Sequence, residues 1–127
     1  MNRETSEKGL PRRARITRSQ EFREAFSGGV HAVGRLMIVW LRKGEGSRRR
    51  LGVVAGKRTF RRAVDRSRVK RLLREVYRLN RAGLEGDSDV VLVARRRLLG
   101  AGLPEASEEL VRLSAKLGLA KNPPRKR

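Results

Sequence analysis

Residues 61–80 read RRAVDRSRVKRLLREVYRLN, and this stretch decides the fold of the chain. Apolar side chains recur at intervals of three and four, the period of an α-helix that rests one side on a core. The predicted apolar side consists of Val69, Leu72, Leu73, Val76 and Leu79, with Tyr77 at its margin. The opposite side, named here the basic ridge, consists of Lys70, Arg71, Arg74, Arg78 and Arg81, with Ser67 among them and Arg66 and Arg68 at its boundary. We therefore expect a long helix that lies on a sheet and directs positive charge outward.

Strand-like segments flank this helix on both sides. Residues 34–43, GRLMIVWLRK, predict a strand that is apolar on both faces, and residues 51–58, LGVVAGKR, predict its hairpin partner across the polar loop 44–50. Residues 89–96, DVVLVARR, predict a short interior strand, and a further short strand is compatible with residues 30–33.

Two more helices are expected near the ends of the chain. Residues 16–29 carry Thr17 and Gln20 in the spacing of a capping box, and two glycines close the segment. Residues 103–119 place Pro104 and acidic residues in the first turn of an amphipathic helix.

The resulting element order is α-β-β-β-α-β-α, which predicts an α+β fold with helices packed on one small sheet of about four strands. We expect a single domain over residues 12–118. Residues 1–11 are predicted to form a basic flexible arm, and residues 119–127 a disordered basic tail.

The charge balance narrows the class of partner. The chain has 127 residues with 33 Lys and Arg against 13 Asp and Glu, a net charge of +20 and a pI near 11.9. Charge of this size indicates an anionic partner, and nucleic acid is favoured over a membrane surface or an acidic protein. No run approaches the roughly 18 apolar residues of a membrane span, so no membrane partner is expected. The absence of cysteine and of an apolar leader segment fits a cytoplasmic protein.

Catalytic chemistry is nearly absent from the sequence. His31 is the only histidine, which excludes a multi-histidine metal site, and it is expected in a loop or at a strand edge. Asp87 and Asp89 could touch a cation, but a turn before a strand explains them better. No glycine-rich phosphate loop occurs. We expect no catalytic residue and no metal ligand in the protein itself.

Binding chemistry, in contrast, is abundant. Residues 57–81 hold eleven Lys or Arg and two acids, and they lack the mixed signs typical of a charged surface that only meets water. Phe22, Phe26 and Trp40 are most simply core residues, but they could instead line a groove in which unpaired bases stack.

Residues 56–78, GKRTFRRAVDRSRVKRLLREVYR, resemble the signature of the bacterial ribonuclease P protein subunit, whose core reads Arg-Asn-Arg, one apolar residue, then Lys-Arg. Here the core is Arg66-Ser67-Arg68-Val69-Lys70-Arg71, with serine in place of the usual asparagine. The resemblance extends over residues 12–118. It implies a fold like the second domain of ribosomal protein S5, with a left-handed βαβ crossover that is rare in general.

The resemblance also implies a function. In this family the protein assists a catalytic RNA in removing the 5′ leader from precursor tRNA, with one protein per RNA. The RNA carries the active site and its Mg²⁺, and the protein alone binds no cofactor.

Contacts to the ribonuclease P RNA are implied for the basic helix and its start: Arg62, Arg66, Ser67, Arg68, Lys70, Arg71, Arg74 and Arg78. A cleft for the precursor-tRNA leader is implied at Phe22, Phe26, Ile38, Trp40 and Val54, with Lys57 and Arg58 at its rim. Composition alone leaves open a ribosomal or other structural RNA-binding protein. A DNA-architectural protein would need a groove-reading helix or arm, and no such signature is present.

Overall fold

The computed structural model describes residues 14–43, 47 and 49–119. The elements run in the order α2 (Ser19–Gly28), β1 (His31–Val33), β2 (Met37–Arg42), β3 (Leu51–Val54), α3 (Ala63–Asn80), β4 (Asp89–Ala94) and α4 (Leu103–Lys116). Two short 3-10 helices, η2 (Arg81–Gly83) and η3 (Arg96–Gly100), flank β4. This order confirms the predicted α-β-β-β-α-β-α succession and the α+β class.

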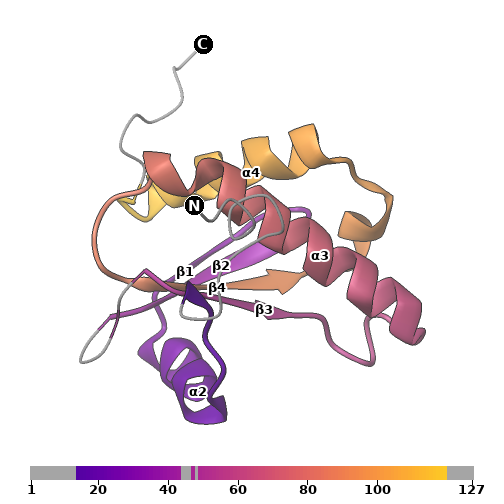
Figure 1. Cartoon of the computed structure of the whole chain (residues 1–127), viewed down its shortest axis with the longest axis horizontal. Coiled ribbons are helices and arrows are strands. Elements are labelled where there is room, and N and C mark those ends of the chain that lie inside the picture. The colour runs from indigo at the N-terminus through magenta and orange to yellow at the C-terminus, as the bar shows by residue number, and fades with distance from the viewer. Residues whose placement is uncertain (1–13, 44–46, 48, 120–127) are drawn as a thin grey trace, which may run out of the picture.

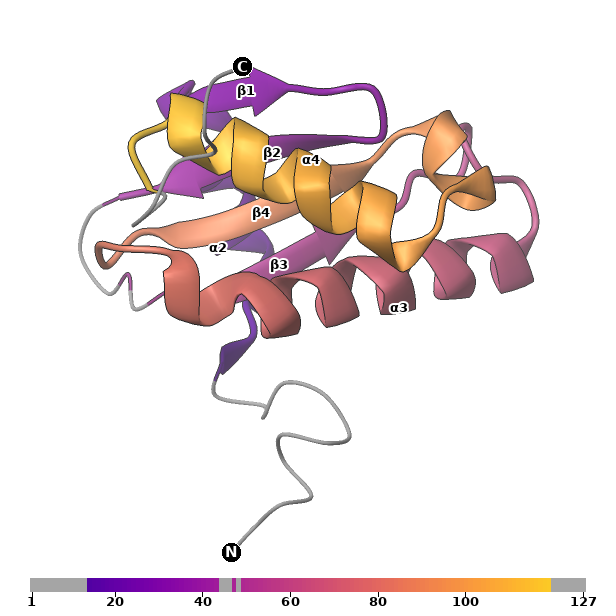
Figure 2. The same ribbon diagram turned by 90° about the horizontal axis from the view of Figure 1, so that it is seen from above.

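The sheet lies between two unequal helical layers (Figure 1). Helices α3 and α4 lie side by side over one face, as the view from above also shows (Figure 2). The single helix α2 lies on the other face. Strand β2 is apolar on both sides as predicted, and its residues Met37, Val39 and Leu41 are buried in the core cluster that includes residues of α3 and α4.

The strand order is β1-β2-β4-β3, so the predicted hairpin between residues 34–43 and 51–58 is wrong. Strand β4 separates β2 from β3; it pairs antiparallel with β2 and parallel with β3. The physical reason is that β4 is almost wholly buried on both faces, and such a strand takes a central position with neighbours on both edges. The prediction that DVVLVARR is an interior strand is confirmed, and β3, α3 and β4 form the expected βαβ unit.

Three local predictions are settled by the structure, two of them as corrections. Helix α2 begins at Ser19 after Arg18, with no side-chain cap, so Thr17 and Gln20 form no capping box. Leu79 is 50% exposed, because the packed side of α3 is centred on Val69, Leu73 and Val76 and Leu79 falls at its flank. The glycine stop of α2 is confirmed, since Gly29 has a φ of 78° and its N–H donates to the carbonyl of Phe26.

The predicted tail begins one residue too early. Leu119 is buried, its N–H donates to the carbonyl of Ser114, and its own carbonyl accepts a hydrogen bond from Glu85 N at 2.6 Å. Leu119 therefore belongs to the domain. The rest of the predicted tail, residues 120–127, and the predicted arm, residues 1–11, lie outside the described residues. Among the helices described, none is long and apolar enough to cross a membrane.

Candidate nucleic-acid interface

Half of the predicted RNA-contacting side chains are exposed on helix α3 or directly before it. Arg62 precedes its first turn, and Arg62, Ser67, Arg68 and Arg71 are exposed. Lys70 is half-buried beside Arg71. Within the described residues no carboxylate forms an ion pair with Arg68, Lys70 or Arg71. This positive charge is therefore available to a phosphate-bearing partner, for which the guanidinium fork is well matched.

Two arginines of the predicted set are engaged inside the protein. Arg66 donates to the carbonyls of Phe60 and Arg61 at 2.8 and 3.1 Å, so it fixes the turn that leads into α3. Arg78 pairs with Glu75, with 2.6 Å between Nη2 and Oε2. Their hydrogen bonds raise the pKa of Arg78 and lower that of Glu75. Arg78 is thus partly neutralised, which the sequence pattern did not indicate.

A further arginine joins the ridge from the N-terminal segment. Ile16 N donates to the carbonyl of Leu51 at 2.8 Å. Arg15 and Leu51 form an isolated parallel β-bridge at the edge of β3 that does not face β4. This places Arg15 near Arg74. Burial, and then the charge of Arg15, lower the pKa of the Arg74 guanidinium. No pattern in the sequence points to Arg15, because only the edge pairing brings it to α3.

On the opposite face of the sheet, the predicted cleft residues do come together. Phe22, Trp40 and Val54 contact the small cluster that Ile16, Ala25 and Val91 form beneath α2. A side chain at position 52 would collide with Phe22, since a Cβ there would lie 2.5 Å from the ring. Gly52 therefore allows Phe22 to lie directly on β3.

Two other rings cover part of Trp40. The imidazole of His31 stacks on it, with ring centroids 4.2 Å apart and an interplanar angle of 18°. Phe26 meets Trp40 edge-on at 5.2 Å and is itself 37% exposed. His31 lies on the edge strand β1, as expected, directly opposite Trp40 in the β1–β2 register. The open aromatic surface here is therefore that of Phe26 and His31.

Beyond the aromatic cluster the sheet face becomes more open. Ile38, Val93 and Val54 are neighbours across β2, β4 and β3, and each is half-buried; we name this row the open strip. Lys57 and Arg58 follow β3 in an exposed turn. An apolar strip of sheet with aromatic rings at one end and cations at the other suits a single nucleic-acid strand whose bases are unpaired.

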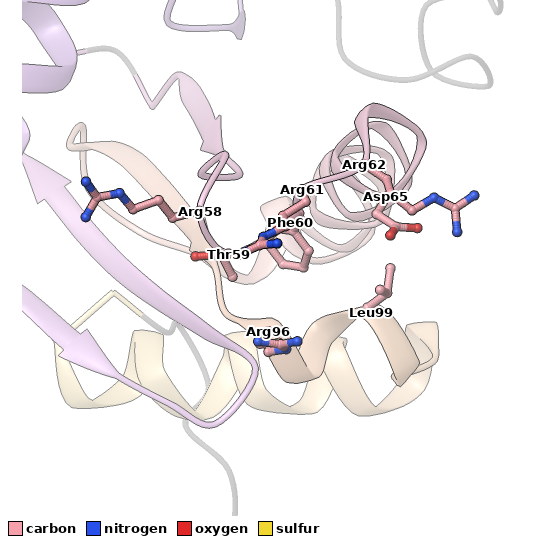
Figure 3. Close-up of a pocket in the computed structure, with 8 residues that line it drawn as sticks. All are labelled: Arg58, Thr59, Phe60, Arg61, Arg62, Asp65, Arg96 and Leu99. Atoms are coloured by element: carbon pink, nitrogen blue, oxygen red, sulfur yellow. The ribbon is translucent and has the colours of Figure 1, made fainter.

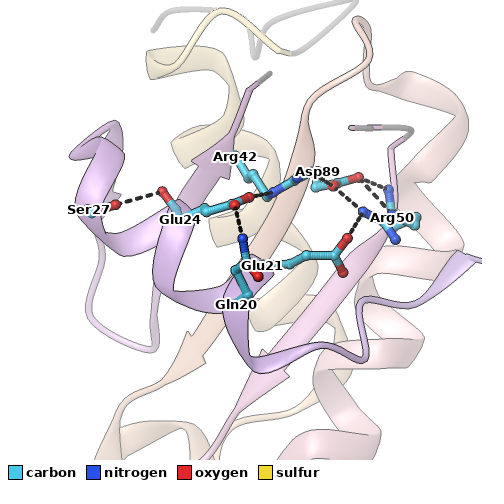
Figure 4. A network of polar contacts seen from close by, with 7 residues as sticks. All are labelled: Gln20, Glu21, Glu24, Ser27, Arg42, Arg50 and Asp89. Atoms are coloured by element: carbon cyan, nitrogen blue, oxygen red, sulfur yellow. Dashed lines mark hydrogen bonds and ion pairs between the residues drawn. The ribbon is translucent and has the colours of Figure 1, made fainter. Parts of the chain in front are cut away.

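A buried ionic network holds α2 on this face (Figure 4). Asp89 is fully buried and accepts hydrogen bonds from Arg42 Nη1 at 2.8 Å and Arg50 Nη2 at 2.9 Å. Arg42 also pairs with Glu24, and Arg50 with Glu21, both on α2. The expectation of a simple turn at Asp89 is therefore wrong: Asp89 opens β4 and joins the sheet to α2. Among the described residues no three His, Cys, Asp or Glu side chains gather as a metal site.

A family model described as ribonuclease P matches residues 10–118. The chain belongs to the ribonuclease P protein family. Similar chains include the ribonuclease P protein component of Coxiella burnetii, 35% identical over 111 residues that cover 87% of this chain and 91% of the relative. That of Desulfovibrio desulfuricans is 40% identical over 110 residues, covering 85% and 80% of the two chains.

Solved ribonuclease P proteins share the fold. The Thermotoga maritima protein aligns with a TM-score of 0.69 at 24% identity, covering 80% of this chain and 96% of its own. A Staphylococcus aureus ribonuclease P protein aligns with a TM-score of 0.70 at 22% identity, covering 86% and 98%. The matches support a ribonuclease P protein over a ribosomal or other structural RNA-binding protein. In this ribonuclease P protein, Ser67 is exposed on α3.

Proposed function

We propose that this ribonuclease P protein assembles one-to-one with a ribonuclease P RNA in the cytoplasm and helps it remove the 5′ leader from precursor tRNA. The observation that carries the proposal is that two surfaces of different chemistry lie on opposite sides of the sheet. Helices α3 and α2 cover opposite sides of the sheet. The exposed cations belong to α3, and the open strip lies on the side of α2. One face meets the folded RNA through phosphates, and the other holds the unpaired leader.

The RNA supplies the active site and its Mg²⁺ in this proposal, and the protein supplies affinity and position. In support, the two fully engaged carboxylates of the core have structural partners. Asp89 binds Arg42 and Arg50, and Glu109 accepts hydrogen bonds from the backbone N–H groups of residues 35–37 at 2.7 to 3.2 Å. The single imidazole, His31, stacks on Trp40. These groups are held for architecture and binding, which supports an active site in the partner RNA.

The direct test is cleavage of precursor tRNA by a bacterial ribonuclease P RNA at low Mg²⁺, with and without the purified chain. We expect the protein to raise the rate of cleavage at the mature 5′ end, and the protein without RNA to cleave nothing. Arg68→Ala with Arg71→Ala should lose the stimulation. The charge-matched control, Arg112→Ala with Lys116→Ala on α4, should keep it. Absence of stimulation by the wild-type chain, or correct cleavage by RNA-free protein, would contradict the proposal.

A further inference from the structure

The aromatic rings of the chain offer few places on which a base can stack. Phe60 and Tyr77 are 3% and 1% exposed and belong to the core. Figure 3 shows Phe60 in the lining of a hollow at the start of α3, beside arginine side chains. Phe22 is half-buried where it lies on β3. The two remaining rings are Phe26 on α2 and Trp40 on β2, and they contact each other.

A side chain of the same molecule already covers one face of Trp40. The imidazole of His31 lies over the indole with 4.2 Å between the ring centroids and 18° between the ring planes, which is the arrangement of a stacked base. Phe26 meets the indole at 83° and therefore covers an edge rather than a face. His31 is exposed on the edge strand β1, so its ring separates the indole from solvent.

Few contacts hold the imidazole in this place. Besides the stack, Nδ1 of His31 donates to the carbonyl of Gly29 at 2.9 Å, and this hydrogen bond is exposed. In the part of the chain that the structure describes, no carboxylate forms an ion pair with His31. An aromatic pair contributes about two- to twelvefold to an equilibrium constant. The covered state therefore dominates, but a change of rotamer at His31 opens the indole without moving β1.

A nucleic-acid strand on the open strip passes this stack. Trp40 lies two residues from Ile38 on β2 and on the same face of the sheet, about 7 Å along the strand. His31 stands opposite Trp40 on β1. A base beside the open strip can thus reach the position that the imidazole occupies, and the two rings cannot occupy it together.

We propose that His31 competes with a leader base for the face of Trp40 and thereby sets how strongly the holoenzyme prefers precursor to mature tRNA. The inference rests on the proposed function. A ligand that binds only the open state loses affinity in proportion to the fraction of molecules that are open. His31 is therefore a specificity-determining residue that lowers the preference for precursor tRNA below the value that an uncovered Trp40 would give.

The test uses the holoenzyme reconstituted with ribonuclease P RNA. His31→Ala and His31→Gln both remove the ring, whereas His31→Phe keeps an aromatic cover. The control is Val33→Ala, since Val33 lies on the same face of β1 and is 52% exposed but does not stack on Trp40. For each variant one measures the affinity of protein for RNA and the ratio of precursor to mature tRNA affinity.

Removal of the ring should raise the ratio about three- to thirteenfold, because the whole population then has an open indole. Assembly with the RNA should not change. Neither His31→Phe nor Val33→Ala should raise the ratio, and His31→Ala should have no effect on it when Trp40→Leu is also present. Trp40 is the only tryptophan of the chain, so its fluorescence should be quenched by precursor tRNA and not by mature tRNA.

A ratio that is unchanged or lower in the variants without a ring would overturn the proposal. So would an equal rise in His31→Phe, or a rise that persists in the Trp40→Leu background. Failure of the proposed function would look different, because the wild-type holoenzyme itself would not prefer precursor to mature tRNA.

Discussion

Replacing Asp89 by asparagine should be the most damaging isosteric change in the molecule. The carboxylate is fully buried, and its oxygens accept hydrogen bonds from Arg50 N and Arg42 Nη1, both at 2.8 Å, and from Arg50 Nη2 at 2.9 Å. The amide of Asp89→Asn would keep the shape but remove the charge that compensates two guanidinium groups. The side chains of Arg42 and Arg50 are only 9% and 17% exposed, so water can solvate little of the guanidinium charge that Asp89 now balances.

Breaking a buried ion pair costs about 3–5 kcal/mol, because it leaves an uncompensated charge. Arg42 and Arg50 retain Glu24 and Glu21 as partners, so we expect a value near the lower limit, about 3 kcal/mol. For a domain of this size that corresponds to a fall in melting temperature of about 10–15 °C. Asp87→Asn is the matched control, since Asp87 is exposed two residues away and should change stability by less than about 0.5 kcal/mol.

The assay is urea unfolding of both variants, followed by binding measurements well below the melting temperature. Because Glu21 and Glu24 join α2 to the network, Asp89→Asn should also weaken discrimination between precursor and mature tRNA while assembly with RNA is retained. A loss of stability under about 1 kcal/mol would show that this network does not hold α2. Equal losses in Asp89→Asn and Asp87→Asn would refute it as well.

Three further predictions concern α3 and the sheet. Arg71→Ala should flatten the slope of log affinity for ribonuclease P RNA against log salt concentration by about 0.9. Arg78→Ala should flatten this slope less, because Glu75 already pairs with Arg78. Equal slopes in the two variants would contradict this difference. Gly52→Ala should lower stability by about 1–3 kcal/mol, because the new Cβ would lie 2.5 Å from the ring of Phe22, and an unchanged urea midpoint would show that the ring moves freely. Burial raises the pKa of Tyr77, whose hydroxyl donates to the carbonyl of Arg49 at 2.9 Å. The folded protein therefore keeps a proton that the unfolded chain releases near pH 10. The contribution of Tyr77 to folding stability is thus fully present below about pH 10 and is lost as pH rises through the folded pKa. Tyr77→Phe should remove this part of the alkaline loss of stability, and an alkaline unfolding profile identical to that of the wild type would contradict the role of Tyr77.

The helical pattern of residues 61–80 predicted the central element because its signal is local. The apolar residues of α3 recur at the helical period and therefore meet the core on one side of the helix. Val69, Leu73, Val76 and Tyr77 are buried accordingly. The basic ridge follows from the same period. The pattern could not show that Arg66 and Arg78 have partners inside the protein. The contact of Arg66 depends on the turn before the helix, and that of Arg78 depends on the rotamer of Glu75.

Strand pairing was predicted less well because it joins residues far apart in the chain. The loop 44–50 suggested a local hairpin, but β4 enters between β2 and β3. That register alone brings Arg42, Asp89 and Arg50 together. The stacking of His31 on Trp40 likewise depends on the β1–β2 register, and no spacing in the sequence specifies it. Of the predicted cleft, the strand residues Ile38, Trp40 and Val54 do lie on one face of the sheet, since inner and outer positions alternate along each strand. The contact of the predicted cleft with the leader stays a prediction.

In the proposed division of labour, one face of the sheet binds the leader and α3 binds the catalytic RNA. The most direct test compares Phe26→Leu with Arg71→Ala in the reconstituted holoenzyme. For each variant one measures the ratio of precursor to mature tRNA affinity and the affinity of protein for RNA. Phe26→Leu should lower the ratio about five-fold or more, the value of one lost base stack, and leave assembly unchanged. Arg71→Ala should weaken assembly and leave the ratio intact. Equal effects of the two substitutions on both quantities would contradict the division of labour between the two faces.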